Sequence, residues 1–156
     1  MEKQARKSPD FLNRAVLYQL FLRPFTPEGT FASAGRLLPH LKELGVDIIH
    51  LCPVNEADGD PDPKFWSPRQ IQSGLNNPKN PYRIANYETI DAEYGSEEEF
   101  REFIRQIHAL GMRIIMDFVY FHCGPTCTLI REHPDYVKLG PNGEVVNGPW
   151  CFPALN

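Results

Sequence analysis

Residues 96–120 have the sequence SEEEFREFIRQIHALGMRIIMDFVY, which predicts a helix followed directly by a strand. Ser96 and Glu99 have the spacing of a capping box, in which each side chain binds the backbone N–H of the other residue. Five apolar residues then recur on one helical face: Phe100, Phe103, Ile104, Ile107 and Leu110. Gly111 ends the helix, and the apolar run 112–120 predicts a buried strand.

The same alternation of strand and helix occurs earlier in the chain. The run 15–23 (AVLYQLFLR) is apolar and is closed by Pro24, which predicts a first buried strand. The stretch 30–44 has apolar residues at helical spacing, but Pro39 interrupts it, so we expect a kink or a second short helix there. The run 46–54 (VDIIHLCPV) predicts a second buried strand, parallel to the first because the connections are short.

A polar segment at 55–86 lacks any helical period and is predicted to be a long loop, which in a compact domain usually serves a site. The order strand, helix, strand, loop, helix, strand is typical of α/β proteins with a parallel sheet. A flavodoxin-like sheet fits this order as well, but the residues after Tyr120 offer no further strand–helix pair. A complete eight-stranded barrel needs about 250 residues, so we expect this chain of 156 to be cut short relative to one.

Composition excludes several classes of function. Hydrophobic residues make up 42% and charged residues 23% of the chain, as in folded soluble domains. A net charge of -4 offers no cationic surface for nucleic acid. No apolar run is long enough to span a membrane, and residues 1–10 (MEKQARKSPD) contain no secretory signal. We therefore expect a cytoplasmic protein without nucleic-acid or membrane partners, whose four cysteines, Cys52, Cys123, Cys127 and Cys151, are reduced thiols.

Three side chains are candidates for binding a ligand. Ligands of parallel α/β proteins lie beyond the carboxyl ends of the strands, where Asp117 and His122 fall. A carboxylate inside an apolar strand is costly without a partner, so Asp117 either serves a site, caps a neighbouring backbone or closes a core ion pair. Tyr82 stands in a proline-fixed turn and can offer a ring face to a pyranose, although loop aromatics more often cover the edge of a core.

A metal site is the competing interpretation of this region. His122, Cys123, Cys127 and His133 could form a zinc set, but their spacing fits no standard finger or ribbon, so we assign no metal ligand. The ring of Trp66 either packs against the core or contacts a ligand. The other rings are interpreted as packing or structural residues: Tyr87, Tyr94, His40, His50 and His108.

Three segments together resemble the opening of a known family. They are VLYQLFLRPF (16–25), HLKELGVDIIHLCPV (40–54) and NPYRIANYETIDAEYGSEEEFREFIRQIHALGMRIIMDFVYFHCG (80–124). Their order and spacing resemble the alpha-amylase family, glycoside hydrolase family 13, over roughly residues 15–124. The most specific part combines the Pro-Tyr turn, the Tyr-Gly-Ser helix start, and Asp117 with His122.

This resemblance implies a fold and a division of the chain. The fold is an α/β architecture, the N-terminal portion of a TIM (β/α)8 barrel with about three strands and two helices. An N-terminal extension at 1–14 precedes the partial barrel at 15–124. Residues 125–156 are then the start of the inserted loop domain that the family carries after its third strand.

The resemblance also implies roles for the candidate residues. Tyr82 stacks under the sugar that bears the scissile bond, His122 hydrogen-bonds that sugar, and Asp117 orders the same subsite, partly by pairing with an arginine near the nucleophile. The family acts on alpha-glucans or alpha-glucosides by a retaining mechanism with two carboxyl groups. Because these groups come from later strands in the family, we expect no catalytic residue in this chain and place the bond-cleaving carboxylates beyond Asn156. Water or a second sugar could accept the glycosyl group.

Two positions depart from the family pattern. Phe121 stands where relatives usually carry an asparagine that is often a calcium ligand, and a phenyl ring cannot coordinate a hard cation, so we expect no metal there and assign no cofactor. Asn86 stands where many relatives carry aspartate. The alternative to an oligosaccharide-processing enzyme is a complete, non-catalytic module that binds carbohydrate or protein through its aromatic loops.

Overall fold

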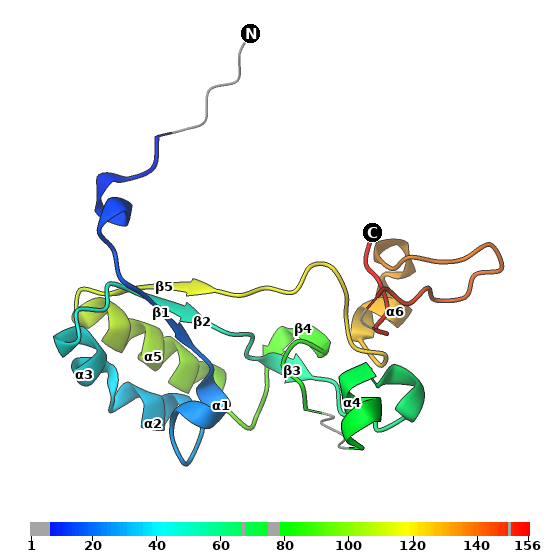
Figure 1. Cartoon of the computed structure of the whole chain (residues 1–156), viewed down its shortest axis with the longest axis horizontal. Coiled ribbons are helices and arrows are strands. Elements are labelled where there is room, and N and C mark those ends of the chain that lie inside the picture. Colours follow the sequence, from blue (N-terminus) through cyan, green and yellow to red (C-terminus); the bar gives the residue numbers. More distant parts are fainter. Residues whose placement is uncertain (1–6, 67, 75–78, 150) are drawn as a thin grey trace, which may run out of the picture.

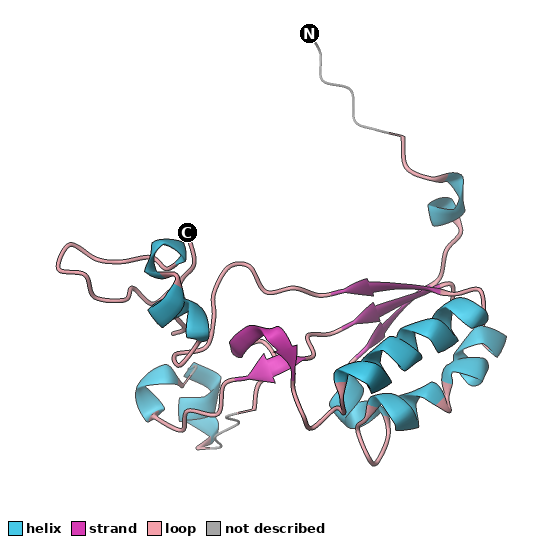
Figure 2. Ribbon diagram, turned by 180° about the vertical axis from the view of Figure 1, so that it is seen from behind, coloured by secondary structure: helices cyan, strands magenta, loops and turns pink. Residues whose placement is uncertain are grey.

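The computed structural model describes residues 7–66, 68–74, 79–149 and 151–156 (Figure 1). Residues 1–6 of the expected N-terminal extension, and residues 67 and 75–78 of the predicted loop, lie outside these ranges. A three-stranded sheet with helices on one face forms one part of the molecule, and a region of short strands, helices and turns lies beside it (Figures 1 and 2).

The elements are short, apart from one long helix. The strands are β1 (Leu17–Leu20), β2 (Ile48–Leu51), β3 (Asn55–Ala57), β4 (Ile84–Ile90) and β5 (Arg113–Met116). The α-helices are α1 (Leu22–Phe25), α2 (Phe31–Gly35), α3 (Leu38–Glu43), α4 (Pro68–Ser73), α5 (Glu97–Ala109) and α6 (Thr128–Glu132). Single 3-10 turns form η1 (Asp10–Asn13), η2 (Pro63–Phe65) and η3 (Pro134–Tyr136).

The main sheet has the order β1-β2-β5, and both pairings are parallel, which confirms the predicted parallel sheet. Leu17 pairs with Ile48, and Ile48 pairs with Arg113, so alternate side chains of the three strands lie in rows. Helices α2, α3 and α5 cover one face of this sheet (Figure 2). Two of these rows pack in the core on this face: Tyr18, Ile49 and Ile114 form one, and Leu20, Leu51 and Met116 form the other.

The opposite face of the sheet corrects one expectation. All three strands were predicted to be buried, yet Leu17 in β1 is 49% exposed and Ile115 in β5 is 47% exposed. The prediction is wrong for β1 and β5 because they are the outer strands of the sheet and the described helices cover a single face. It is right for Ile48, Ile49 and Leu51 of the central strand β2, which are all buried.

The long helix α5 forms as predicted. Ser96 accepts a hydrogen bond from the Glu99 backbone, and the Glu99 carboxylate accepts one from the Ser96 N–H, so the capping box is present. The buried face of α5 packs on Phe31 of α2, whose ring centroid is 5.1 Å from that of Phe100 and 5.7 Å from that of Phe103. The predicted helix at 30–44 is divided into α2 and α3, and Pro39 lies in the first turn of α3, where no N–H is needed.

All three strands are shorter than predicted, and the second covers Ile48–Leu51 instead of 46–54. The predicted strand 112–120 ends at Met116 because its partner β2 ends at Leu51, and the Asp117 N–H makes the last bond, to the Leu51 carbonyl at 2.9 Å. The predicted strand 15–23 ends at Leu20, and α1 follows with Pro24 inside it. Asp117 therefore lies just past the carboxyl end of β5 and is only partly buried, not enclosed in an apolar strand.

The segment predicted as a loop at 55–86 contains more structure than expected. Its ends form a two-stranded antiparallel sheet, β3 with β4, with register shifts next to Glu56. β4 was not predicted because its polar side chains interrupt the alternation of apolar and polar residues that indicates a strand. The residues after His122 fold back as α6, η3 and isolated bridges, among them His122 with Ala154 and Val137 with Leu155.

Among the described residues, every helix is too short or too polar to cross a lipid bilayer.

Candidate sugar-binding site

The three predicted site residues lie together in the structure. The Tyr82 hydroxyl donates to Oδ2 of Asp117 at 3.1 Å, so the carboxylate has a hydrogen-bond partner. Nε2 of His122 lies 2.9 Å from the backbone carbonyl oxygen of Tyr82. Tyr82 comes from the turn before β4, whereas Asp117 and His122 come from the segment that leaves β5. The cluster therefore joins the carboxyl end of the parallel sheet to the smaller β3–β4 sheet.

Local hydrogen bonds fix the turn that presents Tyr82. The side-chain oxygen of Asn80 accepts from the Tyr82 N–H at 3.0 Å, and the Asn80 carbonyl accepts from the Arg83 N–H at 2.8 Å. Pro81 restricts the backbone between them. The turn is thus set by three consecutive residues, and this local chemistry is what made Tyr82 recognisable in the sequence.

Two residues from the ends of β1 and β2 support the phenol of Tyr82. Sγ of Cys52 lies 3.8 Å from the Tyr82 hydroxyl, and the Gln19 side-chain amide donates to the same sulfur at 3.6 Å. Burial, followed by the contact with Cys52, raises the pKa of Tyr82 well above its ordinary value. The phenol therefore stays protonated near neutral pH and remains a donor to Asp117. Neither Gln19 nor Cys52 was singled out from the sequence as a site residue.

The imidazole of His122 has two different ring nitrogens. A carbonyl oxygen can only accept, so Nε2 carries the proton that reaches the Tyr82 carbonyl. Nδ1 is then an acceptor, and it is buried without a hydrogen-bond partner among the described residues. Burial lowers the pKa of His122, which keeps the ring neutral at pH 7.

Tyr87 has a role that its interpretation as a packing residue missed. Its hydroxyl lies 2.7 Å from the Val119 carbonyl oxygen and 3.0 Å from the His122 carbonyl oxygen. Tyr94, by contrast, does pack as predicted, with its ring centroid 6.3 Å from that of Phe31. A phenol that can bond to a distant backbone has no signal in a single sequence.

A buried ion pair next to Tyr82 was also missed. Arg83 and Asp58 are both fully buried, and Nη2 of Arg83 lies 3.1 Å from Oδ1 of Asp58. Oδ2 of Asp58 accepts from the N–H and the hydroxyl of Thr126, at 2.7 and 2.8 Å. The ring of Phe152 lies under the Arg83 guanidinium, with 5.4 Å between the carbon of that group and the ring centroid. These contacts tie β3 and β4 to the chain beyond His122.

The zinc interpretation gains no support. Within the described ranges, no three His, Cys, Asp or Glu side chains lie close enough together to hold a metal ion. His133 stacks on Tyr136, with 4.9 Å between the ring centroids. Cys123 and Cys127 are buried free thiols, and the hydrogen bond between them raises the pKa of Cys123.

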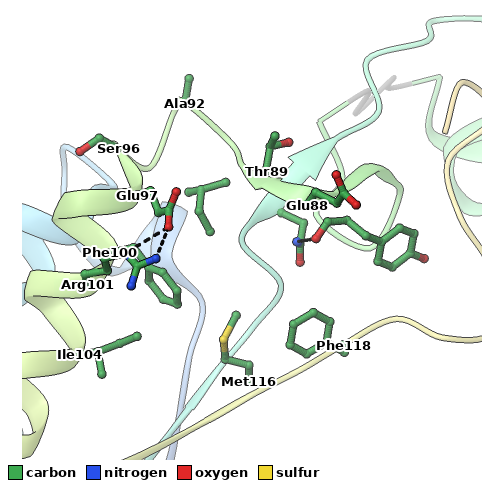
Figure 3. A pocket seen from close by; sticks show the side chains of 14 residues that line it. Glu88, Thr89, Ala92, Ser96, Glu97, Phe100, Arg101, Ile104, Met116 and Phe118 are labelled. Atoms are coloured by element: carbon green, nitrogen blue, oxygen red, sulfur yellow. Dashed lines mark hydrogen bonds and ion pairs between the residues drawn. The ribbon is translucent and has the colours of Figure 1, made fainter. Parts of the chain in front are cut away.

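A hollow of about 620 Å³ lies apart from the predicted site (Figure 3). Phe100 and Ile104 of α5 form one wall, and Met116 and Phe118 at the end of β5 form the other. Tyr82, Asp117 and His122 do not line it. The predicted site thus rests on its own hydrogen bonds and not on this apolar hollow.

Comparison with protein families identifies the family to which this chain belongs. The sequence profile of the alpha-amylase catalytic domain matches residues 26–142. The chain belongs to the alpha-amylase family. The predicted family is thereby confirmed, and so is the fold: the sheet β1-β2-β5 with its helices is the N-terminal portion of an alpha-amylase (β/α)8 barrel.

Individual members of the alpha-amylase family give the extent of the match. A malto-oligosyltrehalose trehalohydrolase of Arthrobacter ramosus is 33% identical over 83% of this chain and 20% of its own length. An alpha-1,4-glucan:maltose-1-phosphate maltosyltransferase of Cereibacter sphaeroides is 30% identical over 75% of this chain and 20% of its length. A crystal structure of an alpha-amylase from Lactobacillus plantarum superposes with a TM-score of 0.79 at 29% identity, over 92% of this chain and 32% of that one. The chain thus spans about a fifth of the length of the curated relatives it matches.

Proposed function

We propose that this chain forms the sugar-binding wall of the active site of an enzyme that hydrolyses or transfers alpha-glucosyl groups. The observation that carries the proposal is the hydrogen-bonded set of Tyr82, Asp117 and His122, which joins two separate sheets at the carboxyl end of the parallel strands. Ligands of (β/α)8 barrels bind at this end. Membership of the alpha-amylase family supports a glucan or glucoside as the ligand.

Each of the three side chains has chemistry suited to a pyranose. The Tyr82 ring provides an apolar face for stacking, while its hydroxyl is held by Asp117. The half-buried ring of His122 lies against the Tyr82 turn, and we assign it a hydrogen bond to a hydroxyl of the same sugar. Asp117, with its remaining lone pairs, accepts from a second hydroxyl or pairs with an arginine of the same enzyme.

The cleavage step requires further groups. Retaining glycoside hydrolysis uses a nucleophilic carboxylate and an acid/base carboxyl about 5–5.5 Å apart. We assign neither role to the described residues and place both carboxyl groups on other strands of the barrel. A trehalohydrolase and a maltosyltransferase both occur among the relatives, which supports proposing either water or a second sugar as the acceptor.

Calorimetric titration of the full-length protein with maltotriose tests the proposal. We expect Tyr82→Ala and His122→Ala to lower the affinity by about tenfold or more each, since each removes a direct contact with the sugar. Tyr136→Ala and His108→Ala delete the same residue types at exposed positions outside the site and should leave affinity unchanged. Wild-type affinity in both site variants would refute the binding role.

Turnover tests the placement of the carboxyl groups separately. A polypeptide of these 156 residues alone that cleaved maltotriose at enzymatic rates would show that the nucleophile and the acid/base lie within it. The expected result is no turnover above that of the buffer.

A further inference from the structure

The phenol of Tyr87 connects β4 to the segment that carries two of the three site residues. Its hydroxyl lies 2.7 Å from the Val119 carbonyl oxygen and 3.0 Å from the His122 carbonyl oxygen. A hydroxyl has a single proton, so the two carbonyls share one donor. The Tyr87 hydroxyl of β4 therefore binds the backbone of the segment from Asp117 to His122 at two residues, Val119 and His122.

The segment 117–122 depends on such contacts because it has left the sheet. Its last ladder bond is the one from the Asp117 N–H to the Leu51 carbonyl. Three of the side chains that follow are exposed: Phe118, Tyr120 and Phe121. Val119 is the buried exception, and its carbonyl is one of the two that Tyr87 binds.

Tyr87 is itself held firmly enough to act as an anchor. Its own carbonyl accepts a hydrogen bond from the side-chain amide of the buried Asn55 at 2.9 Å. β4 is paired with β3, and the turn that carries Tyr82 directly precedes β4 in the chain. Burial raises the pKa of Tyr87, so the hydroxyl keeps its proton over the physiological range.

We propose that Tyr87 is a positioning residue of the sugar site, whose hydroxyl sets the path of residues 119–122 and thereby directs the His122 imidazole to the Tyr82 carbonyl. The inference deepens the proposed function and rests on it. Tyr87 touches neither the sugar nor the reacting atoms. It acts through His122, because the same His122 that offers its carbonyl to Tyr87 places Nε2 2.9 Å from the Tyr82 carbonyl.

The test removes the hydroxyl and keeps the ring. In Tyr87→Phe of the full-length protein, we expect the ring-nitrogen chemical shifts of His122, measured by NMR, to move from the Nε2–H tautomer towards a mixture of both tautomers. We expect maltotriose affinity to fall by about threefold to tenfold, the effect of one lost hydrogen bond. The His122 signals are assigned from their absence in His122→Gln.

Tyr94→Phe is the matched control. It removes one hydroxyl from a buried tyrosine that packs against Phe31 in the core, and no hydrogen bond joins this hydroxyl to Val119 or His122 in the described structure. We expect it to leave both the His122 signals and the affinity at wild-type values. Unchanged His122 signals in folded Tyr87→Phe would overturn the inference, whether or not affinity falls.

Two further outcomes keep the inference separate from the proposed function. If the wild-type protein fails to bind maltotriose, the proposed function is wrong, but the tautomer measurement on Tyr87→Phe still decides whether Tyr87 positions His122. If Tyr87→Phe does not fold, a meta-fluorotyrosine at position 87 retains the hydroxyl as a stronger donor. The His122 signals should then shift in the variant, and identical signals would refute the inference.

Discussion

At the scale of single residues, burial and one hydrogen bond act in opposite directions on the imidazole of His122. Desolvation lowers its pKa, and the hydrogen bond to the Tyr82 carbonyl opposes this with a smaller effect. The folded protein therefore binds this proton less readily than the unfolded chain, in which histidine has a pKa of about 6.5. The stability that the neutral ring contributes is present above that value and is lost as the pH falls below it.

We expect the free energy of unfolding, measured with urea, to fall as the pH is lowered from about 7.5 to about 5.5. In His122→Gln we expect this fall to be smaller. Glutamine keeps an N–H that can donate to the Tyr82 carbonyl but does not titrate. His108→Gln, at an exposed position on α5, is the control and should keep the wild-type pH dependence. A His122→Gln profile parallel to that of the wild type would contradict the assignment of a neutral, buried ring.

At the scale of secondary-structure elements, the capping box at the N-terminus of α5 fixes how this helix packs in the core. The Glu99 N–H donates to the Ser96 hydroxyl at 3.2 Å, and the Ser96 N–H donates to the Glu99 carboxylate at 2.7 Å. Both N–H groups would otherwise lack a partner within the helix. The cap fixes where the helix begins, and with it the register of Phe103 and Ile107 against the sheet.

We expect Ser96→Ala to lower the free energy of unfolding by about 1 kcal/mol, the typical cost of losing an N-cap acceptor. Urea unfolding measures this loss. Ser96→Asp keeps an oxygen acceptor at the same position and should retain most of the stability. Equal losses in the two variants would show that the effect comes from something other than the cap.

At the scale of the whole molecule, the buried pair of Arg83 and Asp58 joins parts that are distant in the sequence. The carboxylate of Asp58, which follows β3, accepts hydrogen bonds from two distant residues. One is Arg83, which precedes β4, and the other is Thr126, which lies beyond His122. Because Arg83 follows Tyr82 directly, this cluster also holds the site between the two sheets in place. A buried charge left without its partner is strongly destabilising.

We expect Arg83→Met to lower the free energy of unfolding by about 3–5 kcal/mol, as breaking a buried pair does. Adding Asp58→Asn should recover part of this loss, since it removes the unpaired charge and keeps an oxygen for Thr126. Arg36→Met breaks the exposed pair of Arg36 with Glu28 and should cost at most about 1 kcal/mol. If Arg83→Met and Arg36→Met lowered the free energy of unfolding in urea by similar amounts, the claim that burial makes the Arg83–Asp58 pair important would be refuted.

Much of the fold follows from patterns within single segments. The 3.6-residue period and capping box of α5, the apolar run of β2 and the break at Pro39 are all signals carried by neighbouring residues, and the structure has each of them. Tyr82, Asp117 and His122 were also identifiable as candidates, because a fixed turn and polar residues at a strand end are local features. Their role in binding sugar remains a prediction.

Sequence alone determined α2, α3 and α5, the parallel order of the strands and the family, because these depend on local periodicity and on motifs of fixed spacing. Tertiary structure alone decided where β5 ends, that β3 pairs with β4, that Asp58 meets Arg83 and that the Tyr87 hydroxyl reaches the His122 carbonyl. The physical reason is that a backbone group or a buried charge is satisfied by whichever partner the folded chain brings within about 3 Å, and that partner is remote in sequence.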